Sequence, residues 1–336
     1  MTEVAVVILN FNVIDLLRKF LPSVIRNSAE AHIVVVDNGS TDGSAKMMAA
    51  EFPSVQLILI EKNLGFCGGY NLALKQIEAT YYLLLNSDVE VTPGWINPLV
   101  NTMKGNPRAG AVQPKILAWK NKTHFEYAGA AGGLIDSLGY PFCRGRLFHS
   151  LEEDQGQYND LARVFWASGA CIMVRSEVFH AIGGLDEEFF AHMEEIDLCW
   201  RMQRNGHEVY YQGASTIYHV GGGTLSAANP RKTYLNFRNG LSLLYKNLPT
   251  FQVWTRLPVR ILLDWIAALK FSLTGQLEDG LAVFRAHRDF LMNWKRERIK
   301  RKAEGRLGYR RPETFYSGSI VWQYFVLGKR KYSELN

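Results

Sequence analysis

The 336-residue sequence has few cysteines and no long apolar run free of charge. Its four cysteines, at positions 67, 143, 171 and 199, include no CxxC pair, which excludes a disulfide framework and a cysteine-based zinc site. The apolar run at residues 4–9 is too short for a signal peptide and has no basic stretch before it. We therefore expect a protein of the reducing cytoplasm.

An excess of basic residues is also missing from the first two thirds of the chain. Residues 1–230 carry 17 Lys and Arg against 24 Asp and Glu, whereas residues 231–336 carry 21 against 8, a net charge of +13. Within that part, residues 295–306 hold seven basic and two acidic side chains. Such a tail is expected to meet an anionic surface, and the alternative is a solvated basic face without a partner.

Hydrophobic patterning over the first half predicts an α/β fold. Four apolar runs have the length and composition of buried strands, at residues 4–9, 33–36, 55–60 and 81–85. Apolar residues at helical spacing lie between the first two runs. This alternation favours a largely parallel, Rossmann-like sheet. Residues 118–160 lack periodicity, and we expect them to form an irregular insertion near the active face.

After residue 230 the pattern changes to long helical periods, at residues 251–273 and 281–302. The first is apolar, but Arg256, Arg260, Asp264 and Lys270 interrupt it, so we expect an amphipathic helix and not a membrane span. We expect residues 1–230 to form the catalytic domain. Residues 231–336 are expected to form a helical, basic extension on an anionic membrane surface, at the inner face of the cytoplasmic membrane. Helices that simply pack on the first domain are the alternative, and no nucleic-acid-binding module is recognisable.

Polar residues follow three of the predicted strands directly. They are Asn10-Phe11-Asn12, the DNGSTDGS segment at 37–44, and Asn86-Ser87-Asp88. Ligands of open α/β sheets bind beyond the carboxyl ends of the strands, so these segments predict a binding site. A dinucleotide site would need a G-x-G-x-x-G turn after the first strand, and its absence tells against a dehydrogenase.

Five segments in order resemble the family 2 glycosyltransferases of the GT-A fold. They are VVILNFN at 6–12, VVVDNGSTDGS at 34–44, NLGFCGGYN at 63–71, LLLNSDVEV at 83–91 and GGLDEEFFAHMEEIDLCWR at 183–201. The resemblance covers residues 4–225. It implies an inverting enzyme that moves a sugar from a nucleotide-sugar donor, dTDP-rhamnose or a UDP-sugar, to a saccharide or polyprenyl-linked acceptor in cell-surface polysaccharide synthesis.

On the donor side, the Asp37 carboxylate can accept the imide N–H of uracil or thymine. Ser40 or Thr41 is expected to cap the helix that begins near residue 43, which leaves Asp37 free for the base. Gly65 and the two glycines that follow it would let backbone approach the nucleoside, although a plain strand-to-helix turn is an alternative. The full set of expected donor contacts is Asn10, Asn12, Asp37, Asn38, Ser40, Asn63, Gly65, Asn71, Asn86 and Ser87.

By the same resemblance, Asn86-Ser87-Asp88 corresponds to the D-x-D motif of the family, whose oxygens hold Mg²⁺ or Mn²⁺ against the donor diphosphate. Asn86 replaces the first aspartate, so Asp88 is the main expected protein ligand. His219 stands where galactofuranosyl-type relatives contribute a second ligand, although a lone histidine can be purely structural. The glycines at 221–223 are expected to form a flexible lid.

Glu194, Glu195 and Asp197 begin a predicted helix. Asp197 is spaced to pair with Arg201, whereas Glu195 starts an apolar stripe through positions 198, 199 and 202. Partial burial would raise the pKa of Glu195 toward the range of a catalytic base, and the helix N-terminus would lower it. The resemblance also assigns the base to Glu195. A role for both glutamates in the helix dipole alone is the alternative.

The resemblance assigns Trp166, Asp186 and Glu194 to the acceptor side. Trp166 could stack on a sugar ring or belong to the core. Two other classes stay open: a nucleotidyltransferase, which usually needs a glycine-rich basic loop after the first strand, and an inactive nucleotide-binding module. The first lacks its loop here, and the presence of Asp88 and Glu195 tells against the second.

Overall fold

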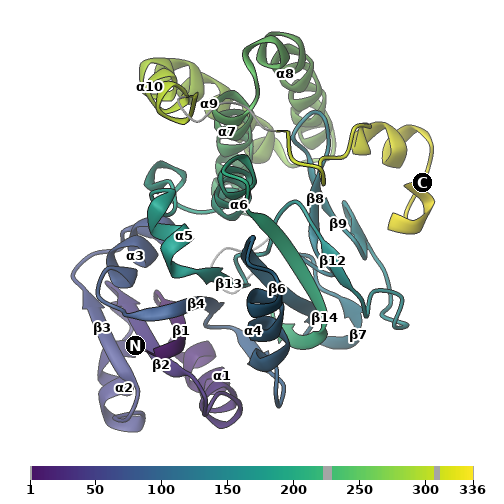
Figure 1. Cartoon of the computed structure of the whole chain (residues 1–336). Coiled ribbons are helices and arrows are strands. Elements are labelled where there is room, and N and C mark those ends of the chain that lie inside the picture. Colours follow the sequence, from purple (N-terminus) through teal and green to yellow (C-terminus); the bar gives the residue numbers. More distant parts are fainter. Residues whose placement is uncertain (1, 222–228, 306–310, 336) are drawn as a thin grey trace.

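The computed structural model describes residues 2–221, 229–305 and 311–335, and its first part alternates strands and helices (Figure 1). The elements are β1 (Thr2–Asn10), α1 (Ile14–Asn27), β2 (His32–Asn38), α2 (Ser44–Glu51), β3 (Gln56–Ile60), α3 (Gly65–Leu74) and β4 (Ala79–Asn86). β1 pairs in parallel with both β2 and β4, and β2 pairs in parallel with β3. The four predicted strands and their Rossmann-like arrangement are confirmed.

The same sheet continues through strands of both directions. It adds β5 (Val89–Val91), β6 (Ala109–Ala118), β7 (Asn121–Phe125), β12 (Leu161–Arg163), β13 (Cys171–Arg175) and β14 (Glu208–His219), with α4 (Ile96–Gly105) before β6. The order is β12-β14-β6-β13-β4-β1-β2-β3, and β13 runs antiparallel to both β4 and β6. The prediction of a largely parallel sheet was therefore wrong for this half. An apolar run buried on both faces carries no signal of strand direction.

Residues 118–160 are more regular than expected. They contain β8 (Gly133–Ile135), β9 (Pro141–Cys143), β10 (Arg146–Leu147) and β11 (Ser150–Leu151), which form a second, antiparallel sheet in the order β11-β10-β9-β8. The prediction of an irregular insertion was wrong in this respect. Strands of two or three residues are too short to show an alternating pattern in the sequence.

Helices make up most of the remaining described chain. They are α5 (Ser176–Ala181), η1 (Glu187–Phe189), α6 (Glu194–Arg204), α7 (Pro230–Asn247), α8 (Thr250–Leu273), α9 (Leu277–Met292), α10 (Trp294–Gly305), η2 (Trp322–Val326) and η3 (Tyr332–Leu335). In Figure 1, α7 to α10 gather at the top of the molecule, while the C-terminal residues return to lie beside β8 and β9. The long helical pattern at 281–302 is divided between α9 and α10, with a break at Asn293.

The helix α8 turns two of its charged side chains, Arg260 and Asp264, toward the protein. Arg260 and Asp264 are buried, and their side chains form an ion pair of 2.7 Å between Nε and Oδ1. Arg260 also donates to the carbonyl oxygens of Leu138 and Gly139, and Tyr140 donates its hydroxyl hydrogen to Asp264. The opposite face exposes large apolar side chains, at Phe251, Trp254, Leu262, Trp265, Ile266, Leu269 and Leu273. We call these seven residues the α8 apolar face. None of the described helices is long and apolar enough to cross a membrane.

Candidate active site

Parallel pairing brings the carboxyl ends of β1, β2 and β4 to one edge of the sheet. Asn10 at the end of β1 lies opposite Asp37, and Leu9 lies opposite Asn86. The polar residues that follow these strands in the sequence therefore meet in space, as the strand-end rule for α/β sheets requires. This edge is the centre of the candidate site.

Asp37 sits in a buried network of hydrogen bonds. Asn10 donates from Nδ2 to Oδ1 of Asp37 (3.1 Å) and to Oγ of Ser40 (3.2 Å), and the Ser40 backbone N–H donates to Oδ2 of Asp37 (3.1 Å). Asn12 accepts the backbone N–H of Thr41 at 2.7 Å. Each carboxylate oxygen has two lone pairs, so Asp37 can still accept a base N–H while these bonds hold it in one orientation.

The capping role expected of Ser40 or Thr41 was wrong. The helix α2 begins at Ser44, after Gly43 in the left-handed conformation (φ 90°). Asp42 receives the Ser44 backbone N–H at 3.0 Å and the Ile14 backbone N–H at 2.9 Å, so it serves the starts of two helices. Gly43 adds a tight turn that the sequence pattern does not reveal. The residue that accepts the first N–H of α2 is therefore Asp42, which lies closer to the helix than Ser40 or Thr41.

Two asparagines hold the glycine-rich segment in place. Asn38 donates to Oδ1 of Asn63 at 3.1 Å and accepts the Leu64 N–H, while Asn63 accepts the Gly65 N–H at 2.8 Å. Gly65 has φ +73°, and a Cβ there would lie 2.5 Å from the ring of Phe190. Packing against Phe190 thus requires this glycine, and the approach of its backbone to the nucleoside stays a prediction.

Asn71 joins α3 to the loop before η1. It donates to the Leu185 carbonyl oxygen at 2.8 Å and to Oε1 of Glu187 at 3.2 Å, and it accepts the Leu185 N–H at 2.9 Å. These bonds give Asn71 a structural role. The donor contact expected of it stays a prediction.

Asp88 and His219 lie side by side. The turn between β4 and β5 holds the half-buried Ser87 and the buried Asp88, and the pairing of β5 with β14 brings His219 opposite Val89. Nε2 of His219 is 3.1 Å from Oδ1 of Asp88 and 3.4 Å from Nδ2 of Asn86. The two residues predicted as metal ligands are therefore neighbours.

Glu126 contacts the other nitrogen of the same imidazole ring, with 3.1 Å between His219 Nδ1 and Glu126 Oε2. Burial lowers the pKa of His219, but hydrogen bonds to Asp88 and Glu126 outweigh it and raise the pKa to about 10. Sequence reasoning missed Glu126, because a single glutamate in a weakly periodic segment carries no motif.

The residues at this position fit a divalent cation that is also held by the donor. Asp88 and His219 place an oxygen and, once the imidazole has lost its Nε2 proton, a nitrogen 3.1 Å apart, which is close to the separation of adjacent ligands on an octahedral ion with bonds of about 2.1 Å. Over the parts of the chain that the structure describes, no three His, Cys, Asp or Glu side chains are placed to hold a metal, since Glu126 lies across the ring. Diphosphate oxygens would have to complete the coordination. Gly222 and Gly223 of the expected lid lie outside the described residues.

Two carboxyl groups at the N-terminus of α6 each leave one oxygen without a partner among the described residues. These oxygens are Oε2 of the buried Glu194 and Oε2 of the half-buried Glu195. Burial raises the pKa of Glu195 to about 7, although backbone N–H groups of the first turn lower it, and burial with the Glu195 charge raises the pKa of Glu194 well above its usual range. Asp197 pairs with Arg201 at 2.7 Å, as expected.

Lys232 and His192 are further neighbours of the site. Burial lowers the pKa of both side chains; the charge of Lys232 lowers the pKa of His192 further, to about 4, while Glu126 raises that of Lys232. Lys232 on α7 therefore lies near both His192, which precedes α6, and Glu126. The sequence carried no signal for it, because a lysine in a helix is usually a surface residue.

Trp166 and Asp186 have structural contacts. Trp166 is 4% exposed, packs its ring on Gly133 and donates its Nε1 hydrogen to the Leu134 carbonyl oxygen. Asp186 caps η1 and pairs with Lys246 (2.9 Å) and Lys300 (2.5 Å). The core alternative thus describes Trp166, and an acceptor contact for either residue stays a prediction.

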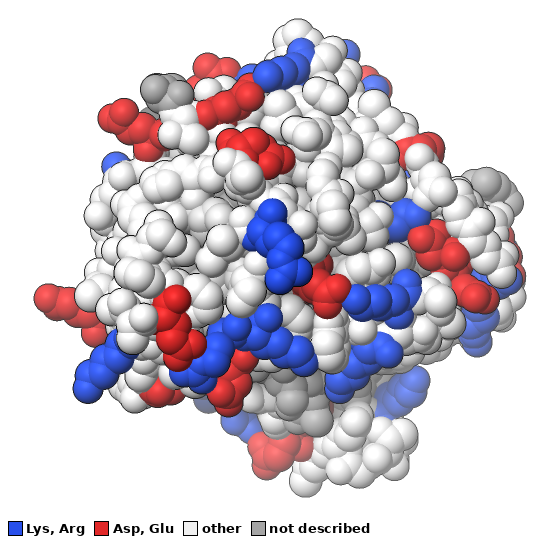
Figure 2. All heavy atoms as spheres, turned by 90° about the horizontal axis from the view of Figure 1, so that it is seen from below, with Lys and Arg blue, Asp and Glu red and all other residues white. Residues whose placement is uncertain are grey.

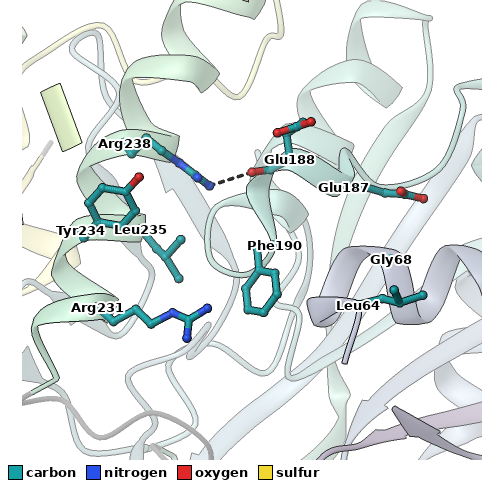
Figure 3. Close-up of a pocket in the computed structure, with 9 residues that line it drawn as sticks. All are labelled: Leu64, Gly68, Glu187, Glu188, Phe190, Arg231, Tyr234, Leu235 and Arg238. Atoms are coloured by element: carbon teal, nitrogen blue, oxygen red, sulfur yellow. Dashed lines mark hydrogen bonds between the residues drawn. The ribbon is translucent and has the colours of Figure 1, made fainter. Parts of the chain in front are cut away.

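A cavity of about 500 Å³ opens beside the glycine-rich segment (Figure 3). Its lining combines aromatic, aliphatic and charged side chains from α3, η1 and α7: Leu64, Gly68, Glu187, Glu188, Phe190, Arg231, Tyr234, Leu235 and Arg238. In Figure 3 the Arg231 guanidinium faces the Phe190 ring, with its Cζ 5.1 Å from the ring centroid, and Arg238 donates to the Glu188 carbonyl oxygen at 2.7 Å. Phe190 precedes Glu194 by four residues, so the cavity adjoins the two glutamates along the chain.

A sequence model of the family described as glycosyl transferase family 2 matches residues 5–183. The chain belongs to glycosyl transferase family 2. This membership makes the protein an inverting glycosyltransferase and tells against the nucleotidyltransferase alternative.

Two relatives and one solved structure illustrate what this family 2 glycosyltransferase is similar to. An N-acetylglucosaminyl-diphospho-decaprenol L-rhamnosyltransferase of Mycobacterium tuberculosis is 28% identical over 283 residues, which cover 76% of this chain and 88% of the relative. A dTDP-rhamnosyl transferase, RfbF, of Shigella flexneri is 25% identical over 64% of this chain and 71% of its own length. GalNAc-T7, solved with UDP, GalNAc and Mn²⁺, superposes with a TM-score of 0.60 at 16% identity, over 75% of this chain and 49% of its own longer chain. The last likeness supports the GT-A fold.

Proposed function

We propose that this glycosyltransferase moves L-rhamnose from dTDP-rhamnose to a polyprenyl-linked saccharide in cell-surface polysaccharide synthesis, with a UDP-sugar as the second choice of donor. The names of the mycobacterial and Shigella relatives support the sugar, the donor and the lipid-linked acceptor. The observation that carries the chemistry is Glu195, whose Oε2 lacks a partner among the described residues and whose pKa lies near 7.

On the donor side, Asp37 would accept the imide N–H of thymine or uracil, held in orientation by Asn10 and Ser40. Asp88 and His219 would hold Mg²⁺ or Mn²⁺ against the diphosphate. That ion would stabilise negative charge on the departing nucleoside diphosphate. The presence of UDP and Mn²⁺ in the GalNAc-T7 structure supports this choice of cofactor.

On the acceptor side, Glu195 would take the proton from the attacking hydroxyl as its oxygen bonds to the anomeric carbon and the bond to the diphosphate breaks. Burial would keep that pKa high, and the Glu195 charge would in turn raise the pKa of Glu194 beside it, because two carboxylates in a buried site resist ionising together. The cavity in Figure 3 suits the acceptor saccharide, since Phe190 and Tyr234 offer faces for sugar C–H groups and Arg231 offers hydrogen-bond donors for its hydroxyls.

The test is product formation by the purified full-length chain. It would be incubated with dTDP-rhamnose or a UDP-sugar, a short-chain polyprenyl-diphosphate N-acetylglucosamine, and either Mn²⁺ or EDTA, and the lipid would be analysed by mass spectrometry. We expect one deoxyhexose to be added to the lipid only when both dTDP-rhamnose and Mn²⁺ are present. Product formed only with a UDP-sugar would make that nucleotide sugar the donor in place of dTDP-rhamnose. No product, together with no thermal stabilisation by any nucleoside diphosphate, would favour the inactive-module alternative.

We also propose that residues 231–336 form an extension that lies on the anionic inner face of the cytoplasmic membrane, beside the catalytic domain of residues 1–230. The α8 apolar face supports this, because seven large apolar side chains exposed on one helix form a patch of the kind that marks an interaction surface. The opposite end of the molecule differs: Figure 2 shows basic and acidic side chains interspersed there, with neither sign covering the face. The net charge of +13 over residues 231–336 supports an anionic membrane as the partner.

A further inference from the structure

A second cavity, of about 770 Å³, lies where α7 ends and α8 begins, against α10. Five of its lining residues are basic, and none carries a carboxylate. Tyr245, Trp254 and Trp294 add aromatic surface. A concave site with this composition suits an anionic group attached to apolar material.

Three of the five basic side chains are already engaged by the protein. Lys246 pairs with Asp186 and Asp197, both at 2.9 Å, and Nη1 of Arg204 lies 3.8 Å from a carboxylate oxygen of Glu304. Arg301 donates to the Tyr245 and Leu248 carbonyl oxygens and to Oγ1 of Thr250. It has no carboxylate partner among the described residues.

The other two cations, Arg298 and Lys302, lie exposed on α10, and the described part of the chain contains no ion-pair partner for either. They are four residues apart, so they occupy the same side of the helix. Five cations line this cavity, and the pKa of Arg301 is lowered by burial and by the charge of Arg204, against an opposing effect of Tyr245. An anion bound there would relieve this repulsion.

The cavity continues into the α8 apolar face. Trp254 lines the cavity and is also 72% exposed as a member of that face. A cationic hollow at the edge of an apolar surface matches the arrangement of a lipid, in which a phosphate headgroup joins hydrocarbon chains. A soluble anion would use the cations but would leave Trp254 and its neighbours in water.

We propose that this cavity binds the phosphate headgroup of an anionic membrane lipid when the α8 apolar face rests on the bilayer. The inference rests on the membrane position of the C-terminal extension proposed above. Arg298 and Lys302 reach the phosphate directly, and Arg301 supports it from the cavity wall. Trp254 enters the interface between headgroups and hydrocarbon chains.

Two double variants with equal loss of charge test the site. Arg298→Gln with Lys302→Gln removes the two unpaired cations of the cavity, whereas Arg288→Gln with Lys295→Gln removes the same residue types from exposed positions on α9 and α10 outside it. Binding of each full-length protein to phosphatidylcholine vesicles, with and without phosphatidylglycerol, would be measured by co-sedimentation. Thermal unfolding midpoints would check that all the proteins are folded.

The unsubstituted protein is expected to bind only the vesicles that contain phosphatidylglycerol. The cavity pair should weaken that binding by about tenfold more than the control pair. Equal losses of vesicle binding in the two double variants would overturn the headgroup site but not the membrane position. Such a result would mean that the net positive charge of the extension attracts the vesicle, wherever the individual cations lie. No binding of the unsubstituted protein would overturn the membrane position as well.

A separate arm distinguishes a lipid from a soluble anion. Inorganic phosphate and pyrophosphate would be titrated without vesicles while thermal unfolding of the unsubstituted protein and the cavity pair is followed. We expect no stabilisation that depends on Arg298 and Lys302. A stabilisation that the cavity pair loses would reassign the cavity to a free phosphate and overturn its assignment to a bilayer lipid.

Discussion

The helices α6 and α8 both bury charged side chains, and they do so in opposite ways. At the start of α6, Glu194 and Glu195 each leave an oxygen without a partner among the described residues. In the middle of α8, Arg260 and Asp264 bond to each other and to surrounding polar groups. An unpaired buried carboxylate costs stability, whereas the bonds within a buried pair offset much of the cost of burying its two charges, and that cost returns when one partner is removed.

This difference separates the proposed site of proton transfer on α6 from an ion pair that orients α8. The carboxylates of α6 keep raised pKa values that suit proton transfer. The ion pair of α8 fixes which side of the helix faces the protein, and so turns the α8 apolar face outward. His287 completes the pair, because it receives the Trp265 N–H at Nδ1 and can then donate from Nε2 to Asp264.

Glu195→Gln should have the largest effect on turnover. The amide cannot accept the acceptor proton, so we expect kcat to fall by about 10²- to 10⁴-fold. The free energy of unfolding at pH 8 should stay equal or rise, since a buried unpaired charge is removed. Steady-state kinetics and urea unfolding would measure the two effects. A clear loss of stability with unchanged kcat would give Glu195 a structural role instead.

Asp264→Ala should have the largest effect on stability. It leaves the Arg260 guanidinium buried without its carboxylate, which costs about 3–5 kcal/mol of unfolding free energy. Glu278→Ala is a matched control, because its pair with Arg285 is exposed and is worth under about 1 kcal/mol. Equal changes in urea unfolding for the two variants would contradict an orienting role for the buried pair.

The pH dependence of activity and stability should diverge because of Glu195. A base with a pKa of about 7 loses its proton as pH rises, so kcat/KM should fall about 100-fold from its plateau to pH 5. The folded state holds this proton more tightly than the unfolded chain, whose glutamate titrates near 4.3, so its contribution to stability decreases as pH rises between these values. Unfolding measured against Glu195→Gln across that range isolates the contribution. A pH-independent difference would contradict it.

Glu126→Gln should have a smaller effect, on metal affinity. Glu126 orients the His219 ring through Nδ1, and loss of such a partner typically weakens metal binding by about 10- to 100-fold. Electron paramagnetic resonance of free Mn²⁺, in the presence of a nucleoside diphosphate, would report the affinity. The exposed Glu153→Gln in the same segment is the control. Unchanged Mn²⁺ affinity in Glu126→Gln would rule out this positioning role.

The convergence of polar residues at the strand ends could be predicted from sequence, because the information is local. Strand ends such as Asn10, Asp37 and Asn86 follow apolar runs directly, and parallel pairing then aligns them without further instruction. The pairing of Asp197 with Arg201 followed in the same way from helical spacing. Glu126 and Lys232 could not be identified from the sequence in this way, because their proximity to the site depends on contacts between segments far apart in the chain.

The sequence by itself determined the four strands of the first half, the long helical stretches after residue 230, the order of the family segments and the charge imbalance between the two parts of the chain. Only the tertiary structure decided the direction of β13, the contact between His219 and Glu126, and the side of α8 that faces outward. The periodicity of a sequence shows that a helix has an apolar and a charged face, and the usual rule places the apolar face against the protein. On α8 the bonding of Arg260 to Asp264 and to distant carbonyl oxygens outweighs that rule.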